Sequence, residues 1–97
     1  MKTTDDWIPL LKALADPTRL ELIRHLLIGE HTVEELAASL NATEYNISKH
    51  LRILRQAGVV VSSKDGRHLH NRVAPAFRKR IGRRRVLDLG CCSFRFD

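Results

Sequence analysis

The sequence contains little cysteine, and the cysteines that it has cannot form a disulfide framework. Cys91 and Cys92 are adjacent in the chain, so a bond between them would close no loop. No apolar run approaches the roughly 20 residues of a membrane-spanning helix, and residues 1–6 lack the apolar stretch of a secretory signal. These absences exclude a disulfide scaffold and predict a cytoplasmic protein.

Length and charge distribution predict one small domain with a polyanionic partner. The chain has 97 residues and neither a repeat nor a low-complexity linker. Residues 1–44 carry four basic and eight acidic side chains, a net charge of −4, whereas residues 45–97 carry 13 basic and three acidic ones, a net charge of +10. The second part is therefore expected to face a polyanion. Composition alone does not separate DNA from RNA or from an acidic membrane.

Two helices are predicted at the start of the chain. Apolar residues recur at helical spacing over residues 5–15. Asp16 followed by Pro17 is typical of an N-cap and a first helical position, so a second helix begins there. This second helix is expected to end at Gly29.

Two more helices follow, joined by a tight turn. Thr32 and Glu35 have the spacing of a capping box and predict a short helix. Thr43 is expected to cap a longer helix that ends near Gly58.

The remainder of the chain is predicted to contain a hairpin, a short helix and an extended tail. Residues 59–63 and 68–73 have strand character, and Asp65-Gly66 between them is a hairpin turn signal. Residues 75–81 are expected to form a short helix, and residues 86–96 a strand or extended segment.

The longer helix of the middle pair has one apolar and one polar side. Ile47, Leu51 and Leu54 fall within about 60° of one another on a helical wheel. The other side carries residues that could reach base edges, namely Glu44, Tyr45, Ser48, Lys49 and Arg52. A solvated face is the alternative interpretation of this side. Glu44 suits either a hydrogen bond from cytosine N4 or a charge interaction with the helix N-terminus.

The order of elements predicts a winged helix-turn-helix, a mostly α fold with a β-hairpin wing. A short helix, a tight turn and a polar-faced helix form the helix-turn-helix, and the basic hairpin forms the wing. Lys64 and Arg67 flank the hairpin turn and are expected to contact phosphates or the minor groove.

Four segments of the sequence resemble the ArsR/SmtB family of bacterial repressors. They are residues 14–20 (LADPTRL), 43–51 (TEYNISKHL), 57–60 (AGVV) and 64–67 (KDGR). The resemblance implies a homodimer that binds a palindromic operator and releases it on a metal or redox signal. It assigns the recognition positions to Thr43, Glu44, Tyr45, Ser48 and Lys49.

The metal-sensing positions of the family are not matched in this sequence. The resemblance assigns the thiolate sensor to Thr32 and Glu34, which supply no thiolate, and residues 75–81 of the last predicted helix contain no histidine. Cys91 and Cys92 remain candidates for a soft ion such as As(III) or for a redox role. Since neighbours on a strand point to opposite faces, a cysteine packed as a small hydrophobe is the simpler interpretation. No other metal site is predicted.

The tail also allows an enzymatic interpretation. Residues 86–91 (VLDLGC) are similar to the first motif of S-adenosylmethionine-dependent methyltransferases, in which a strand runs into a glycine-rich turn. That motif needs a second glycine so that the backbone approaches the cofactor, and Cys92-Ser93 stands in its place. The sequence therefore predicts that the protein is not an enzyme.

The predicted organisation is a DNA-binding domain over residues 1–82 and a basic, then apolar tail over residues 83–97. The tail is expected to pack on the core or to join a dimer interface. The predicted dimer surface consists of Trp7, Ile8, Leu11, Leu14, Phe94 and Phe96. The predicted function is that of a homodimeric transcriptional repressor, which binds double-stranded DNA sequence-specifically and has no membrane partner. The alternative is a winged-helix protein-interaction module with weak or no DNA binding. The basic residues from Arg78 to Arg85 have no assigned role.

Overall fold

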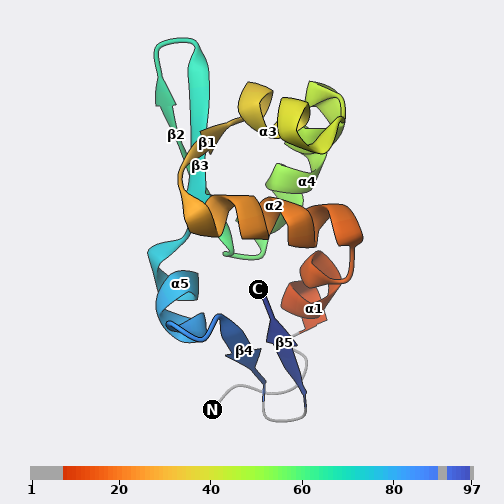
Figure 1. Cartoon of the computed structure of the whole chain (residues 1–97), viewed down its shortest axis with the longest axis vertical. Helices are drawn as coiled ribbons and strands as arrows, with labels where there is room; N and C mark the ends of the chain where they lie inside the picture. The colour runs from red at the N-terminus through yellow and green to blue at the C-terminus, as the bar shows by residue number, and fades with distance from the viewer. Residues whose placement is uncertain (1–7, 90–91, 97) are drawn as a thin grey trace.

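A computed structural model describes residues 8–89 and 92–96 of the chain. Its helices are α1 (Ile8–Leu14), α2 (Pro17–Ile28), α3 (Val33–Leu40), α4 (Glu44–Gln56) and α5 (Pro75–Ile81). Its strands are β1 (His31–Thr32), β2 (Val60–Asp65), β3 (His68–Val73), β4 (Val86–Asp88) and β5 (Ser93–Arg95). Helix α2 crosses the middle of the molecule, with α3 and α4 on one side and α1, α5 and the β4–β5 pair on the other (Figure 1). None of the helices in the described ranges is long and apolar enough to cross a membrane.

The helices begin where the capping residues predict. The Asp16 carboxylate accepts hydrogen bonds from the second and third backbone N–H groups after it, at 2.8 and 3.1 Å, and Pro17 occupies the first turn of α2. Thr32 and Glu35 exchange the two hydrogen bonds of a capping box, at 2.8 and 3.2 Å. The Thr43 hydroxyl accepts from the backbone N–H three residues later at 3.1 Å. Local side-chain chemistry therefore fixes these three starts.

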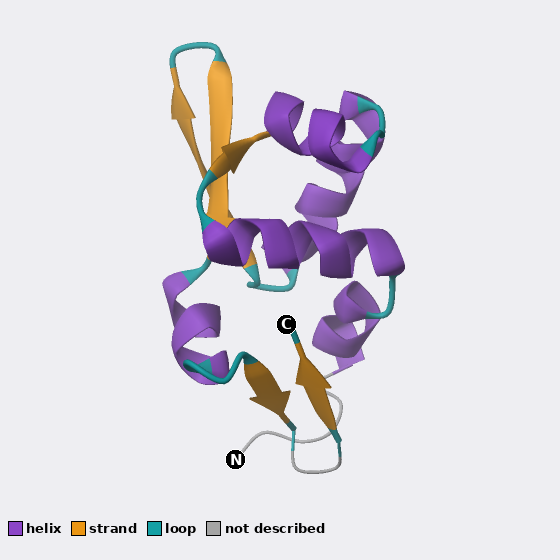
Figure 2. Cartoon of the chain, viewed as in Figure 1, coloured by secondary structure: helices purple, strands orange, loops and turns teal. Residues whose placement is uncertain are grey.

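The wing is part of a three-stranded antiparallel sheet in the order β1-β3-β2. Strand β1 was not predicted, because two residues are too few to show alternation, and it forms by pairing His31 with Asn71 of β3. The predicted turn is shifted by one residue. Asp65 pairs with His68, so Gly66 and Arg67 form the turn, with Gly66 at φ 63°. The β2–β3 hairpin projects beyond the helices (Figure 2).

One buried cluster connects all five helices. The predicted inner stripe of α4, Ile47, Leu51 and Leu54, is fully buried in it. Leu22 and Ile23 of α2 belong to the same cluster and are also fully buried. The core therefore fixes which side of α4 faces outward.

The tail folds back as a second hairpin, where a single strand or extended segment was expected. Strand β4 pairs with β5 in antiparallel register, and Leu87, Leu89 and Phe96 are buried in the same cluster as the helices. The Phe96 ring packs edge-on against Phe77 of α5, with 5.8 Å between ring centroids. The tail thus takes the first of its two predicted roles and packs on the core.

Candidate nucleic-acid interface

The outer face of α4 is an exposed surface of mixed polar and basic side chains. Tyr45 is 72% exposed, and Lys49 places its Nζ 5.6 Å from the centroid of the Tyr45 ring. The structure brings the predicted residues Tyr45, Ser48, Lys49 and Arg52 together around one hollow of about 340 Å³, which Arg55 also lines. Arg55 was not predicted. These groups can donate to base edges and to phosphates.

The turn between α3 and α4 depends on a left-handed residue. Asn41 has φ 52° and ψ 49°, and its N–H donates to the carbonyls of Ala37 and Ala38. The Ala42 N–H also donates to the Ala37 carbonyl, at 2.9 Å. Asparagine tolerates this conformation better than most residues, so α3 ends in a tight turn.

Two of the predicted contact residues lie at the start of α4. Thr43 is exposed, and its hydroxyl is already engaged in capping the helix. Glu44 is exposed in the first turn, where a negative charge interacts favourably with the helix N-terminus. Both residues therefore have a part in forming the helix, whatever they contact outside it.

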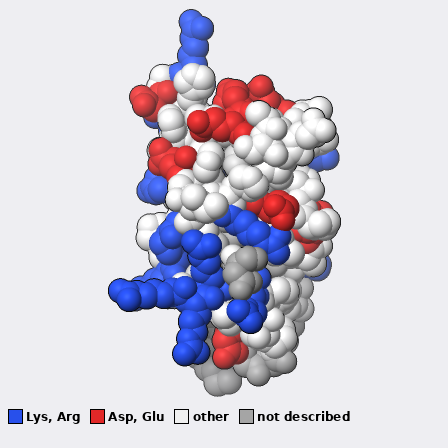
Figure 3. Space-filling model, in the orientation of Figure 1, with Lys and Arg blue, Asp and Glu red and all other residues white. Residues whose placement is uncertain are grey.

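The predicted wing residues Lys64 and Arg67 are exposed at the far end of the hairpin. Figure 3 shows a basic side chain at the tip of the hairpin and acidic side chains below it, toward α3. The tip is therefore a cationic point that stands away from the helical body, as a phosphate contact requires.

A chain of hydrogen bonds joins α4 to all three strands of the wing sheet. The Arg55 guanidinium donates to the Ser62 hydroxyl at 3.2 Å, and that hydroxyl donates to Oδ1 of Asn71 at 2.6 Å. The Asn71 amide donates to the carbonyls of His31 and Leu69, at 3.2 and 3.1 Å. The signal in the sequence is a lone amide at a buried position of an alternating strand, but its partners are distant in the chain.

Two histidine–glutamate contacts hold the wing against the start of α3. Nδ1 of His70 lies 3.1 Å from Oε2 of Glu30, and Nδ1 of His68 lies 3.7 Å from Oε2 of Glu34. Within the described ranges, no group of three or more potential ligands could hold a metal ion. The two contacts therefore join β3 to the first turn of α3 and to the segment that leads into it.

The start of α2 is tied to α4 by the partly buried guanidinium of Arg19. Nε of Arg19 donates to the carbonyl of Ala13 at 2.6 Å, and Nη1 lies 3.1 Å from Nδ1 of His50. Since arginine only donates, Nδ1 of His50 accepts this bond when the imidazole is neutral. The contact sets the position of α4 relative to α1 and α2.

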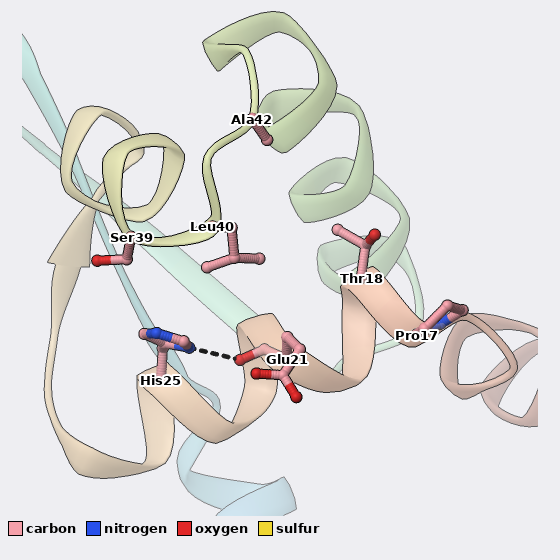
Figure 4. A pocket seen from close by; sticks show the side chains of 7 residues that line it. All are labelled: Pro17, Thr18, Glu21, His25, Ser39, Leu40 and Ala42. Atoms are coloured by element: carbon pink, nitrogen blue, oxygen red, sulfur yellow. Dashed lines mark hydrogen bonds between the residues drawn. The ribbon is translucent and has the colours of Figure 1, made fainter.

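A hollow of about 370 Å³ separates α2 from the connection between α3 and α4 (Figure 4). Its two ionisable lining residues are Glu21 and His25, and both are engaged within α2. Nδ1 of His25 lies 2.8 Å from the Glu21 backbone oxygen, and the Glu21 carboxylate pairs with Arg24. Because both ionisable side chains already bind within α2, they do not form a ligand-binding site. The hollow lies at the junction of α2 with the α3–α4 connection.

The predicted sensor and dimer residues differ in their exposure, and two of them lie outside the described residues. Cys92 is exposed, whereas Cys91 and Trp7 lie outside the described residues. Leu14 and Phe96 are buried inside the monomer, which leaves Ile8 at 40% exposure and the half-buried Leu11 and Phe94 for a partner. After Gly90 the chain returns as the antiparallel strand β5 rather than entering a helix, unlike a cofactor-binding βα unit.

Comparison with known proteins identifies the family. Residues 16–62 match the bacterial regulatory proteins of the arsR family. The chain belongs to the ArsR family. A curated relative of this ArsR-family chain is the arsenical resistance operon repressor of Escherichia coli K12, which is 39% identical over 69 residues. The match covers 70% of this chain and 59% of that repressor, so the chain spans less than two thirds of that relative's length.

Solved structures agree with this assignment. HlyU from Vibrio cholerae N16961 matches with a TM-score of 0.74 at 30% identity, over 82% of this chain and 88% of HlyU. A possible ArsR-family regulator from Mycobacterium bovis, Mb0332, matches with a TM-score of 0.74 at 28% identity, over 79% of this chain and 71% of that one. The solved part of Mb0332 is a homodimeric winged helix-turn-helix DNA-binding domain. The predicted family and the predicted winged helix-turn-helix fold are therefore confirmed.

Proposed function

We propose that this ArsR-family protein is a cytoplasmic transcriptional repressor that binds double-stranded DNA sequence-specifically. The observation that supports this function best is the exposed face of α4, where Tyr45, Ser48 and Lys49 surround one hollow beside a wing with cationic residues at its tip. In this proposal α4 enters the major groove, while Lys64 and Arg67 contact the phosphate backbone.

The proposal includes a homodimer on a palindromic operator. The homodimeric domain of Mb0332 supports it, as does the exposure of Ile8 on α1. A two-fold dimer places its recognition helices on half-sites about 10–10.5 bp apart. Sedimentation of the wild type and of Ile8→Asp tests the dimer directly, because a charge at a buried interface position disfavours association.

The decisive experiment is selection of bound duplexes from a random pool. We expect enrichment of an inverted repeat and a steep fall of affinity with salt concentration. If no sequence is enriched and the affinity for DNA does not depend on salt, the chain is a protein-interaction module and the proposed function is wrong.

The same selection tests the effector. The relative from E. coli is named an arsenical resistance operon repressor, which supports As(III) as a candidate for this chain. Cys91 and Cys92 are the thiolates that could bind a soft ion. Repeating the selection with As(III), with Zn²⁺ and with an oxidant, on the wild type and on Cys91→Ser/Cys92→Ser, shows whether release depends on these cysteines.

A further inference from the structure

The chain carries a second cationic surface, which the proposed contact with DNA does not use. Between residues 75 and 96 there are seven basic residues and one acidic residue, Asp88. Six of the basic residues are exposed. One of them, Arg78, hydrogen-bonds to the end of α2, and we call the other five the α5 basic surface: Lys79, Arg80, Arg83, Arg84 and Arg95. Figure 3 shows Lys and Arg side chains gathered over the half of the molecule that contains α5.

Two further arginines of this segment have a structural role. The Arg78 guanidinium lies 3.4 Å from the carbonyls of Leu26 and Leu27 and so binds the end of α2. Arg85 adopts the left-handed region at φ 54°, and its carbonyl accepts from the Phe96 N–H at 2.9 Å. The hydrogen bond from the tail hairpin therefore holds Arg85 in a backbone conformation that an isolated turn would disfavour.

The tail also completes a groove on this surface. Arg84, Val86, Ser93 and Arg95 line a space of about 380 Å³. Arg95 lies opposite Val86 in the β4–β5 register, so the groove exists only because the tail folds back. Two guanidinium groups and a hydroxyl suit an anion with several acceptor oxygens, as a phosphate has.

The α5 basic surface is separate from the surface formed by α4 and the wing. The wing tip and α5 lie toward opposite ends of the molecule, whose longest extent is 41 Å (Figure 1). Glu30 and Glu34 lie beside the wing, against His70 and His68 of β3, and Figure 3 shows acidic side chains between the wing tip and the basic half of the molecule. A duplex on α4 and the wing would meet these acids before it reached α5.

We propose that the α5 basic surface binds the phosphate backbone of a second duplex DNA segment. Of the large apolar side chains exposed among the described residues, Ile8, Tyr45 and Ile53 lie on α1 and α4, and only Ile28, at the end of α2, borders the α5 segment. A membrane surface would be met by apolar side chains beside the cations, and a protein partner by an aromatic or apolar anchor. A phosphate backbone needs only the cations. The proposal rests on the proposed function for the choice of DNA among nucleic acids.

The experiment removes the first surface and then tests the second. The background is the full chain with Lys49→Gln, Arg52→Gln, Lys64→Gln and Arg67→Gln, and the probe is a fluorescein-labelled 20-bp mixed-sequence DNA duplex. We expect this background to bind the probe with a salt-dependent affinity. Adding Arg84→Gln/Arg95→Gln should weaken binding at least tenfold and reduce the salt slope by about 2, since each phosphate contact contributes about 0.9.

Control variants distinguish the surface from net charge and from misfolding. Lys12→Gln removes a charge on α1, outside the α5 basic surface, and should weaken binding less than twofold. Arg84→Lys/Arg95→Lys should retain the salt slope. Lys79→Gln/Arg83→Gln provides a second test at exposed positions outside the groove, with circular dichroism to verify folding.

Three outcomes would overturn the proposal. They are a background that does not bind the duplex, an equal loss on Lys12→Gln, and a preference for phosphatidylserine vesicles over DNA at equal anion concentration. The proposed function is judged separately, by sequence selection with the wild type. The function can therefore fail while the second surface still binds DNA, and the reverse also holds.

Discussion

The Ser62 hydroxyl donates a hydrogen bond of 2.6 Å to the side-chain oxygen of Asn71, and through it the wing is joined to α4. Asn71 is 0% exposed and is the only buried polar residue within the described ranges. Its removal would leave the carbonyl of His31 without its side-chain partner. One buried amide therefore ties β1, β2 and β3 together, and the Arg55–Ser62 hydrogen bond extends this network to α4.

This relationship predicts a coupled loss of stability. Asn71→Ala should lower the free energy of unfolding by about 2–3 kcal/mol, because it leaves buried polar groups unpaired. Ser62→Ala should cost about 1 kcal/mol, and the double variant should cost less than the sum of the two. Urea denaturation measures all three. Ser63→Ala, at the exposed neighbouring position, is the control, and an equal loss there would contradict the role of the network.

Variants of α4 should change the sequence preference of DNA binding, whereas variants of the wing should change its salt dependence. Ser48→Ala should relax the preference at one base position by about 1 kcal/mol, because the hydroxyl lies on the side of α4 that is proposed to face the major groove. Arg67→Ala should weaken binding to all sequences and reduce the salt slope by about 1. Titrations of matched and mismatched duplexes over a range of salt concentrations check both. If the salt dependence of the affinity were unchanged in Arg67→Ala, the wing would not be part of the DNA interface.

Asp16 should make the stability of the protein sensitive to acid. Burial works to raise the pKa of Asp16, but the Arg19 backbone hydrogen bond, the charges of Arg19 and His50 and the Thr18 backbone hydrogen bond together hold this pKa below its ordinary value of 3.8. Because the pKa is lower in the folded state, the stabilisation is present above about pH 4 and is lost as the pH falls through the folded pKa.

Asp16→Asn isolates this effect because asparagine keeps the cap and cannot titrate. We expect the difference in unfolding free energy between wild type and Asp16→Asn to shrink below about pH 4. Asp16→Ala should cost about 1 kcal/mol at neutral pH through loss of the cap. Thermal unfolding at a series of pH values makes the comparison, and a difference that does not change with pH would contradict the assignment.

The tail should contribute to the stability of the monomer. Phe96 is 1% exposed and packs against Phe77, so Phe96→Ala should cost about 3–5 kcal/mol. Phe94 is only half-buried, and Phe94→Ala should cost clearly less. Denaturant unfolding at low protein concentration measures the two variants away from any dimer. Equal and small losses would mean that the tail does not belong to the core.

The sequence by itself determined the local features of this protein. Asp16, Thr32 and Thr43 set the starts of helices because each supplies an oxygen to nearby backbone N–H groups. The spacing of Ile47, Leu51 and Leu54 determined which side of α4 is buried and hence which side is free for DNA. These properties depend on residues a few positions apart, and so they can be read without a structure.

Only the tertiary structure decided how distant segments meet. Strand β1 exists because β3 pairs with it, and the Arg55–Ser62–Asn71 contacts join three elements whose partners no local pattern indicates. The return of the tail as β5 buried Phe96 and formed the groove between Arg84 and Arg95. Such contacts depend on chain closure over long separations, where hydrogen bonding and burial are decided by the whole core.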